Sequence, residues 1–564
     1  MTKSGDVGPS LGALNVSTTE DGTTSATLPP TAGATLPPTG GVPGMDTKAG
    51  GLGSPAQAVA LATLCAVLFL TFLDNTVVSV GLADVQSSLH AGITSLQWVV
   101  NGYALTFAAF MLAGGTLGDL LGRKAVMLSG VGVFCIGSVI AATAPNVDAL
   151  IAGRIIMGLG AAASEPGTLS IIRHVYPDEH TRADALGVWA AVSGLALALG
   201  PVIGGVLVGL WSWRAIFWFN LLIGAVALLM AYLFVPETSD REEGHLDWLG
   251  IVLGAFTLAF VSFGIIQGEE SGYLTWWIDM FFALSVVLGF AFTHHERRAA
   301  HPILDVSLFR RGPFSGSVFV AFAAYFGTFS IFFFTALYLE VVVNASAYAT
   351  AVTFLPMAAC LILGSVFTGP WVARRGPRTP MTAGCVLAAT GILITSAILS
   401  PHVDLHTLGW VLSIAGAGFG IMLVPVTSTP LTVVEPEHSG MAASVTNTSR
   451  EMGAVFGVAV LGSIVNSKLT GQLAARLKAL GIPPSFQSVV LHAVTGGGLG
   501  GGGAATTAEH SKDAAIAKIA TKVVNAAYEA FGSGLHVALD ISGILLLIGA
   551  VVSVTAVRGR RRLS

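Results

Sequence analysis

Long, uninterrupted apolar runs dominate this sequence and leave few folds open to it. A helix needs roughly 20 apolar residues to cross the hydrocarbon core of a bilayer, and about fourteen runs meet that length. They start near Ala56, Leu96, Ala125, Ala149, Ala185, Ala215, Trp248, Trp276, Phe314, Ala349, Met381, Leu408, Met441 and Leu535. Strands of a membrane barrel are short and alternate in polarity, whereas these runs are continuous. The sequence therefore predicts an all-α membrane protein with about fourteen transmembrane helices.

The composition agrees with a membrane-embedded chain and argues against a soluble enzyme. Of the 564 residues, 53% are hydrophobic and 10% are charged, against about a quarter charged in soluble domains. The four cysteines lie in apolar runs without metal-binding spacing, so we expect them to be small core residues. We expect no catalytic constellation, metal, cofactor or nucleic-acid partner.

Basic residues follow the even-numbered apolar runs, and the short loops after runs 1, 3, 7, 9 and 11 contain no Lys or Arg. The basic residues that follow even-numbered runs are Arg123, Lys124, Arg173, Arg182, Arg241, Arg297, Arg298, Arg310, Arg311, Arg374, Arg375, Arg378, Arg558, Arg560, Arg561 and Arg562. Cytoplasmic loops carry the excess of Lys and Arg in multi-pass proteins. This pattern predicts that both termini are cytoplasmic. We separately expect the membrane to be the cytoplasmic membrane of a bacterium.

Asp74 lies inside the apolar run Leu61–Val80. A carboxylate in hydrocarbon is costly, so such a residue is a functional candidate by default. Burial favours the neutral form of a carboxyl group, which suits a proton carrier, although a structural hydrogen bond would also explain the residue. Asp74 has no basic neighbour nearby in the sequence. Asp74→Asn fills the same volume and removes a desolvated charge, so we expect it to leave stability unchanged or higher.

Two further charged residues, Arg154 and Glu165, share another apolar run. We expect Arg154 to pair with Asp74 or another acid. Glu165 follows Arg154 by eleven residues, on nearly the same helix face but roughly 16 Å away, too far for a direct salt bridge. It precedes Pro166, where the helix opens. Glu165 is therefore either a proton or cation site or a buried structural acid.

Weaker candidates are Glu340, at the end of the ninth run, and Asp540, in the last run. A phenylalanine-rich face could line a drug pocket, but lipid contact or core packing is the better interpretation. Its members are Phe326, Phe329, Phe332, Phe333 and Phe334.

The loop after the second run, Gly115–Lys124, reads GTLGDLLGRK and resembles the GxLaDrxGRK loop of the major facilitator superfamily. Gly115 and Gly122 permit a tight turn and close helix approach. Asp119 can bind a helix N-terminus or an Arg, so that it forms a cytoplasmic latch with the basic pair Arg123 and Lys124. A weaker echo after the tenth run, Gly369–Arg378, has Ala373 in place of the acid, which implies two related halves.

The fifth run resembles the gxxxxxGPxxGG motif of the superfamily's antiporters. The matching residues are Gly194, Gly200, Pro201, Gly204 and Gly205. Pro201 removes a backbone donor and kinks the helix, and the glycines allow close packing. A kinked, tightly packed helix can rock and can seal against ion leak.

Three other stretches resemble the fourteen-span drug:proton antiporters of that superfamily. They are Leu73–Val78 (LDNTVV), Trp211–Phe217 with Asn220, and Arg154–Gly160. The resemblance implies a major facilitator fold of two six-helix bundles plus two inserted helices. It also implies a monomer that exports a lipophilic, often cationic small molecule in exchange for protons. The alternatives are an exporter of one endogenous metabolite (an antibiotic, lipid or siderophore) and, more remotely, a proton-coupled importer.

The implied organisation has five parts. Residues 1–54, rich in Thr, Gly, Pro and Ser, form a disordered cytoplasmic tail. Residues 55–240 form the first bundle and 241–300 the two inserted helices. Residues 301–557 form the second bundle, with a long external loop at 467–532. Residues 558–564 form a basic cytoplasmic tail.

Overall fold

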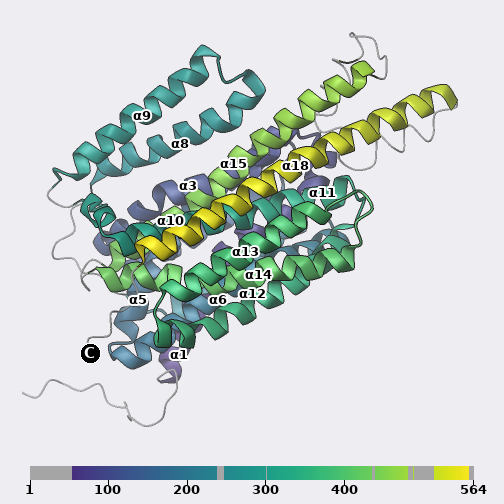
Figure 1. The fold of residues 1–564 in the computed structure, drawn as a ribbon. Helices are drawn as coiled ribbons and strands as arrows, with labels where there is room; N and C mark the ends of the chain where they lie inside the picture. Colours follow the sequence, from purple (N-terminus) through teal and green to yellow (C-terminus); the bar gives the residue numbers. More distant parts are fainter. Residues whose placement is uncertain are drawn as a thin grey trace, which may run out of the picture. The chain divides into compact units, whose positions relative to one another are not determined.

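The apolar runs form helices over almost their whole length in the computed structural model, which describes residues 54–237, 247–299, 302–434, 439–479, 487 and 514–557. The predicted tails, 1–54 and 558–564, lie outside the described residues except for Ser54. No strand occurs in the described ranges (Figure 1). The helices are α1 (Pro55–Val77), η1 (Val78–Gly81), α2 (Leu82–Leu89), α3 (Ile93–Leu121), α4 (Arg123–Ala142), α5 (Val147–Val175), α6 (Glu179–Leu210), α7 (Arg214–Phe234), α8 (Trp248–Ser271), α9 (Trp276–Glu296), η2 (Val306–Arg310), α10 (Gly312–Phe329), η3 (Ser330–Thr335), α11 (Ala336–Val341), α12 (Ala347–Arg375), α13 (Arg378–Ile398), α14 (Leu405–Val433), α15 (Ser439–Ala479) and α18 (Ala514–Ala556).

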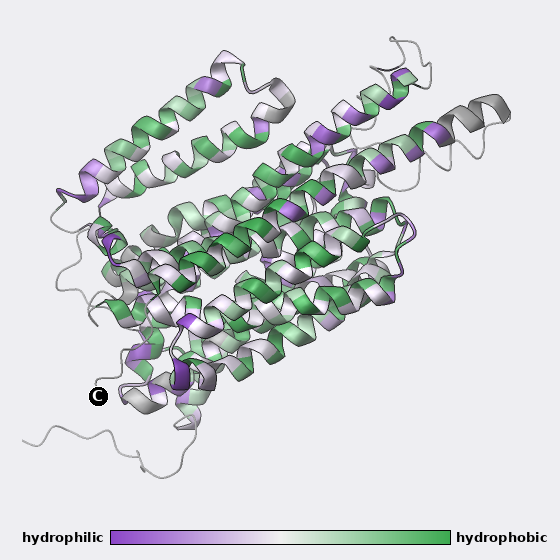
Figure 2. Cartoon of the chain, viewed as in Figure 1, coloured by the Kyte–Doolittle hydropathy of each residue, from purple (hydrophilic) through white to green (hydrophobic). Residues whose placement is uncertain are grey.

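Among the described residues, fourteen helices are long enough to cross a bilayer, with α10 counted together with its continuation through η3 and α11. Thirteen stretches meet the length and hydropathy expected of a membrane span among the described residues. The helix α3 contains side chains outside the described set and is not one of the thirteen, but its 29 residues exceed the roughly 20 that a span needs. Figure 2 shows apolar residues along the helices and hydrophilic residues gathered toward several helix ends. The predicted all-α, fourteen-span fold is confirmed.

The helices pack as two groups of six. In the first group α3 and α4 pack on α5, and α1 packs on α6 and α7. In the second group α12 and α13 pack on α14, and α10, α15 and α18 pack on one another. The two groups meet mainly where α6 packs on α12 and where α3 packs on α15. Part of the site described below lies at this interface between the halves.

The inserted helices α8 and α9 form a hairpin whose two arms run side by side (Figure 1). The helix α8 packs on α3 and α15, so the hairpin touches both halves. The hydroxyl groups of Tyr273, in the hairpin turn, and Ser463, on α15, are hydrogen-bonded. Of the residues of α9, only Ile278, Ser285 and Glu296 are buried, so most of this helix is not covered by the rest of the described structure.

Side-chain caps define where several helices begin. Ser54 and Gln57 form a reciprocal capping box at α1. Single side chains accept the first free N–H groups of five other α-helices. These caps are Asn146 for α5, Asp178 for α6, Asp247 for α8, Ser346 for α12 and Asp404 for α14.

Two sequence-based expectations concern the second half. The segment 467–532, predicted as an external loop, is helical at both ends, up to Ala479 in α15 and from Ala514 in α18. The rest of that loop, except Gln487, lies outside the described residues. The phenylalanine cluster is buried: it lies in α10 and the π-helical turn η3, with each residue at most 5% exposed. Core packing, rather than lipid contact, therefore explains these rings.

Candidate functional site

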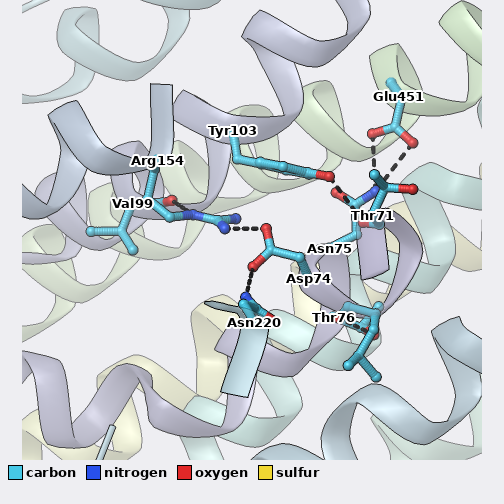
Figure 3. A network of polar contacts seen from close by, with 10 residues as sticks. Thr71, Asp74, Asn75, Thr76, Val99, Tyr103, Arg154, Asn220 and Glu451 are labelled. Carbon is cyan, nitrogen blue, oxygen red and sulfur yellow. Dashed lines mark hydrogen bonds and ion pairs between the residues drawn. The ribbon is translucent and has the colours of Figure 1, made fainter. Parts of the chain in front are cut away.

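Asp74 lies in the middle of the first apolar span and is fully buried. Its Oδ2 accepts from the Nη1 of Arg154 on α5, and its Oδ1 accepts from the Nδ2 of Asn220 on α7 at 2.6 Å (Figure 3). The expected pairing of Arg154 with an acid is present, and the acid is Asp74. A buried ion pair persists when further hydrogen bonds satisfy both partners, as here.

Arg154 has two other contacts that hold its guanidinium in place. Its Nε donates to the backbone carbonyl of Val99 at 2.9 Å. Its guanidinium carbon lies 4.5 Å from the ring centre of Tyr103, a cation–π contact. The Tyr103 hydroxyl donates to the carbonyl of Thr71 on α1 at 2.9 Å (Figure 3). The pair is therefore built from α1, α3, α5 and α7, all within the first half.

Glu165 belongs to a second polar cluster, which sequence reasoning missed. Its Oε1 accepts from the Nδ2 of Asn447 on α15 at 3.3 Å, while its Oε2 is buried without a hydrogen-bond partner among the described residues. Arg450 donates to the Asn447 Oδ1 at 3.0 Å and to the hydroxyl of Tyr325 on α10. The Arg450 guanidinium carbon also lies 4.5 Å from the Tyr325 ring and 5.2 Å from the ring of Phe72.

Glu451 completes this cluster. It is 2% exposed, and its two oxygens lie 3.3 and 3.4 Å from the Nδ2 of Asn75 on α1 (Figure 3). The Glu165 and Glu451 carboxylates repel each other when both are ionised, and both are attracted to Arg450. Arg450 and Glu451 could have been identified from the sequence. They are adjacent charged residues inside an apolar run, which makes them functional candidates for the same reason as Asp74.

The weaker candidates lie elsewhere. Glu340 accepts from the backbone N–H of Ala83 and lies near Asp84 on α2, and its Oε1 has no hydrogen-bond partner within the described ranges. The Asp540 side chain is exposed on α18. The structure does not bring either residue into contact with Asp74 or Glu165 in the part of the chain that it describes.

The α6 motif contacts the helix that carries Asp74. Pro201 has no N–H, so the carbonyl four residues earlier, Leu197, lacks its usual helical donor. The Thr76 hydroxyl donates to that carbonyl at 3.0 Å. A Cβ on Gly200 would lie only 2.9 Å from the Thr76 Cβ, and one on Gly204 2.5 Å from the Val77 carbonyl oxygen. Close packing of α6 on α1 requires glycine at both positions.

The other two motif glycines face the second half. A Cβ on Gly194 would lie 3.0 Å from Leu423 on α14, and one on Gly205 would lie 2.6 Å from the carbonyl oxygen of Ala347 on α12. The motif as a whole therefore lies between α1 and the second half.

The segment Gly115–Lys124, predicted as a loop, is helical except at Gly122: it comprises the end of α3, the single connecting residue Gly122 and the first two residues of α4. Gly122 has φ +107°, a backbone conformation that favours glycine. The backbone N–H of Lys124 donates to Glu237 Oε1 at 3.2 Å, and the Nζ of Lys124 donates to the Tyr232 carbonyl at 2.8 Å. Glu237 follows α7 and was not predicted as a partner.

The other residues of this loop are less informative. A Cβ on Gly115 would meet Pro166 of α5 at 3.5 Å, an ordinary contact distance. Arg123 is half-buried and begins α4. The Asp119 side chain lies outside the described part of the structure.

A small apolar cavity of about 30 Å³ adjoins the second cluster at Tyr325. Its lining comes from both halves, with Leu197 of α6 facing α10, α12 and α14. The lining residues include Leu197, Thr328, Leu361, Phe419, Met422 and Val426. This volume holds about one water molecule, so the cavity is too small for a drug-sized molecule in this conformation.

Comparisons with known proteins agree with this architecture. Residues 64–458 match the family described as Major Facilitator Superfamily. The methylenomycin A resistance protein of Bacillus subtilis (strain 168) is 35% identical over 414 residues, which are 73% of this chain and 88% of that protein. The multidrug efflux pump LfrA of Mycolicibacterium smegmatis is 30% identical over 515 residues, which are 90% of this chain and 97% of that protein.

A solved structure shares the fold. It is a bacterial homolog of the human lysosomal transporter Spinster, in an inward-facing and occupied conformation, with a TM-score of 0.59 at 19% identity. The match covers 90% of this chain and 97% of that chain. Since the family match spans most of the sequence and the relatives extend over 73% and 90% of it, the chain belongs to the Major Facilitator Superfamily.

Proposed function

We propose that this protein is a proton-coupled antiporter that exports lipophilic, often cationic compounds across a bacterial cytoplasmic membrane. The observation that carries the proposal is the buried Asp74–Arg154 ion pair, held by Asn220 and Val99 in the middle of the first half. Relatives named for drug resistance and multidrug efflux support the direction and the substrate class.

The ion pair gives the proton a defined effect. With Asp74 ionised, the pair is neutral and α1 is held against α5 and α7. A proton on Asp74 removes the attraction and leaves the Arg154 charge uncompensated in a low-dielectric setting. The two protonation states therefore favour different helix arrangements, and such a difference in free energy is what drives alternating access. Protonation from outside would favour the inward-facing state, where the proton is released and substrate is loaded.

The two motifs have distinct roles in this cycle. Gly115, Asp119, Gly122, Arg123 and Lys124 act as the cytoplasmic latch, which docks on Glu237 and the end of α7. The α6 residues Gly194, Gly200, Pro201, Gly204 and Gly205 keep α6 close to α1 and the second half, so that the halves rock without a leak path. Both termini are cytoplasmic by the distribution of basic residues, and the protein acts as a monomer.

A second candidate function is the export of one endogenous metabolite. It is favoured by a relative that is named for resistance to a single antibiotic, methylenomycin A. A drug-sensitivity panel compared with metabolite analysis of a deletion strain separates the two functions. Multidrug export predicts sensitivity to several unrelated compounds, and dedicated export predicts retention of one metabolite.

Uphill export in proteoliposomes tests the main proposal. The purified full chain is reconstituted, a pH gradient is imposed, and movement of a panel of lipophilic cations and neutral drugs is followed. We expect accumulation against the concentration gradient, lost when a protonophore collapses the pH gradient. Accumulation that is indifferent to the protonophore would contradict proton coupling.

A further inference from the structure

We propose that Glu165 and Glu451 form a binding site for the protonated amine of an amphiphilic monocation, and that the amine displaces one proton shared by the two carboxyl groups. The inference rests on the proposed export function and specifies the chemistry of its substrate. The proposed binding site is the polar cluster of Glu165, Arg450 and Glu451 between the halves, and it does not include the Asp74–Arg154 pair.

The first observation is a reciprocal arrangement across the interface between the halves. Glu165, in the first half, accepts from Asn447 of the second half, and Glu451, in the second half, accepts from Asn75 of the first. These side-chain hydrogen bonds join the two halves directly. A movement of the halves during transport must break them, so both carboxylates then need new donors.

The second observation is the charge balance. Glu165, Glu451 and Arg450 are each at most 2% exposed, and two carboxylates against one guanidinium leave one negative charge uncompensated. The neighbouring Asp74–Arg154 pair is neutral and does not offset it. Uncompensated charge in a buried site is costly, so the cluster holds one proton or one cation.

The third observation is the kind of group that the cluster accepts. The Asn75 and Asn447 amides approach the carboxylates as N–H donors, and the Glu165 Oε2 is buried without a partner in the described ranges. A ligand that takes over these positions must itself donate hydrogen bonds. A protonated primary, secondary or tertiary amine does so, whereas a quaternary ammonium has the charge but no N–H.

The fourth observation is the apolar cavity beside Tyr325, whose hydroxyl accepts from Arg450. Leu197, Phe419 and Met422 line it from both halves, so it enlarges when the halves separate. A cation bound at the carboxylates therefore has an apolar space for its body next to the charged end. This combination selects an amphiphilic monocation with an aryl or alkyl body.

The test uses a matched ligand pair, 4-phenylbutyl-dimethylamine and 4-phenylbutyl-trimethylammonium, with the purified full-length protein in nanodiscs. Calorimetry in two buffers of different ionisation enthalpy gives the affinity and the protons released. We expect the tertiary amine to bind about tenfold more tightly, which is the order expected for a charge-assisted hydrogen bond, and to release one proton per ligand. Equal affinity for the two ligands, or binding without proton release, would overturn the proposal.

Variants assign the exchange to the cluster. Glu165→Gln and Glu451→Gln, tested separately so that a folding defect in one leaves the other informative, should each weaken amine binding about tenfold and abolish proton release. Asp540 is an exposed acid on α18, so Asp540→Asn is the matched control and should bind as the wild type does.

Other charged and titratable groups lie around the two carboxylates and contribute to the pH dependence of binding. They are Asp74 on α1, Tyr103 on α3, Arg154 on α5, Tyr325 on α10 and Arg450 on α15.

Asp74→Asn distinguishes the two carboxyl sites. Proton release that disappears in Asp74→Asn but persists in Glu165→Gln and Glu451→Gln would place the exchange at Asp74 and refute this inference. Uphill export in proteoliposomes, measured beside the binding, separates the two proposals. A protein that exports its substrates but shows no preference for the tertiary amine retains the proposed function and lacks this site.

Discussion

Thr76 donates its hydroxyl to the Leu197 carbonyl at 3.0 Å, which is the backbone acceptor that Pro201 leaves without a helical donor. This bond ties α1 to α6 across 121 residues of sequence. The antiporter motif therefore does more than bend its own helix. Its proline exposes a carbonyl that α1 binds, two residues after Asp74.

Three consecutive residues of α1 thus contact three different structures. Asp74 pairs with Arg154, Asn75 reaches Glu451 in the second half, and Thr76 bonds to α6. Successive side chains point about 100° apart around a helix, so three consecutive residues can contact three different neighbouring helices. In the proposed cycle, a shift of α1 on protonation of Asp74 would therefore be transmitted to the interface between the halves and to α6 together.

Thr76→Val should destabilise the protein and reduce uphill export. Valine has nearly the same shape, but the Leu197 carbonyl loses its donor, and an unsatisfied buried polar group costs about 1–3 kcal/mol. Thermal unfolding in detergent and proton-driven efflux in proteoliposomes measure the two effects. Thr76→Ser keeps the hydroxyl and should retain most of both. If the valine and serine variants behave alike, the hydrogen bond has no role.

Gly200→Ala should be destabilising by about 1–3 kcal/mol, because the new methyl group would overlap Thr76 and force α6 away from α1. Gly187→Ala is a matched control on the same helix, since a Cβ there meets nothing within 4 Å. In a helix interior the control substitution should be neutral or stabilising by about 0.5–1 kcal/mol. Similar unfolding midpoints for the two variants would show that α1 and α6 do not pack as described.

The spans and Asp74 could be predicted from the sequence because both depend on local patterns. A run of apolar residues defines a membrane helix, and a charge inside the run stands out against it. Arg154 could be matched with Asp74 by the same reasoning, since a buried charge needs a counter-charge. Arg450 and Glu451 carried this local signal as well, and weighing every charge within the runs would have identified them.

The remaining contacts depend on which helices pack together, and the sequence does not specify this locally. Asn75 and Asn447 are neutral amides, so hydropathy does not mark them as partners of buried acids. Glu237 lies outside the apolar runs, and its contact with the α3–α4 connection depends on how α7 ends beside it. The bond from Thr76 to Leu197 needs both the missing donor at Pro201 and the packing of α1 on α6.

Gly122→Ala should slow transport without abolishing substrate binding. An alanine at φ +107° is strained, at a cost of about 1–3 kcal/mol, and its Cβ would lie 2.8 Å from the Glu237 carboxylate. The docking of Lys124 on Glu237 would be disturbed, which biases the conformational equilibrium. Gly132→Ala on α4, where a Cβ meets nothing within 4 Å, is the control. Unchanged turnover in Gly122→Ala, measured beside ligand affinity, would count against the latch.

Asp74→Asn should abolish uphill export, because an amide cannot carry the coupling proton. Downhill exchange should persist in the same vesicles if only coupling is lost. The sequence-based expectation that this substitution leaves stability unchanged or higher is revised by the structure. Arg154 is 1% exposed and pairs with Asp74, so the variant leaves a buried charge without its partner, at a cost of about 3–5 kcal/mol.

The double variant Asp74→Asn/Arg154→Gln separates stability from coupling. Removing both charges should recover much of the stability lost in Asp74→Asn alone, because no buried charge is left unpaired, while uphill export should stay absent. Unfolding midpoints of the wild type, both single variants and the double variant give the interaction energy of the pair. Additive losses of stability would show that the two charges do not interact. Uphill export at the wild-type rate in Asp74→Asn would exclude Asp74 as the carrier of the coupling proton.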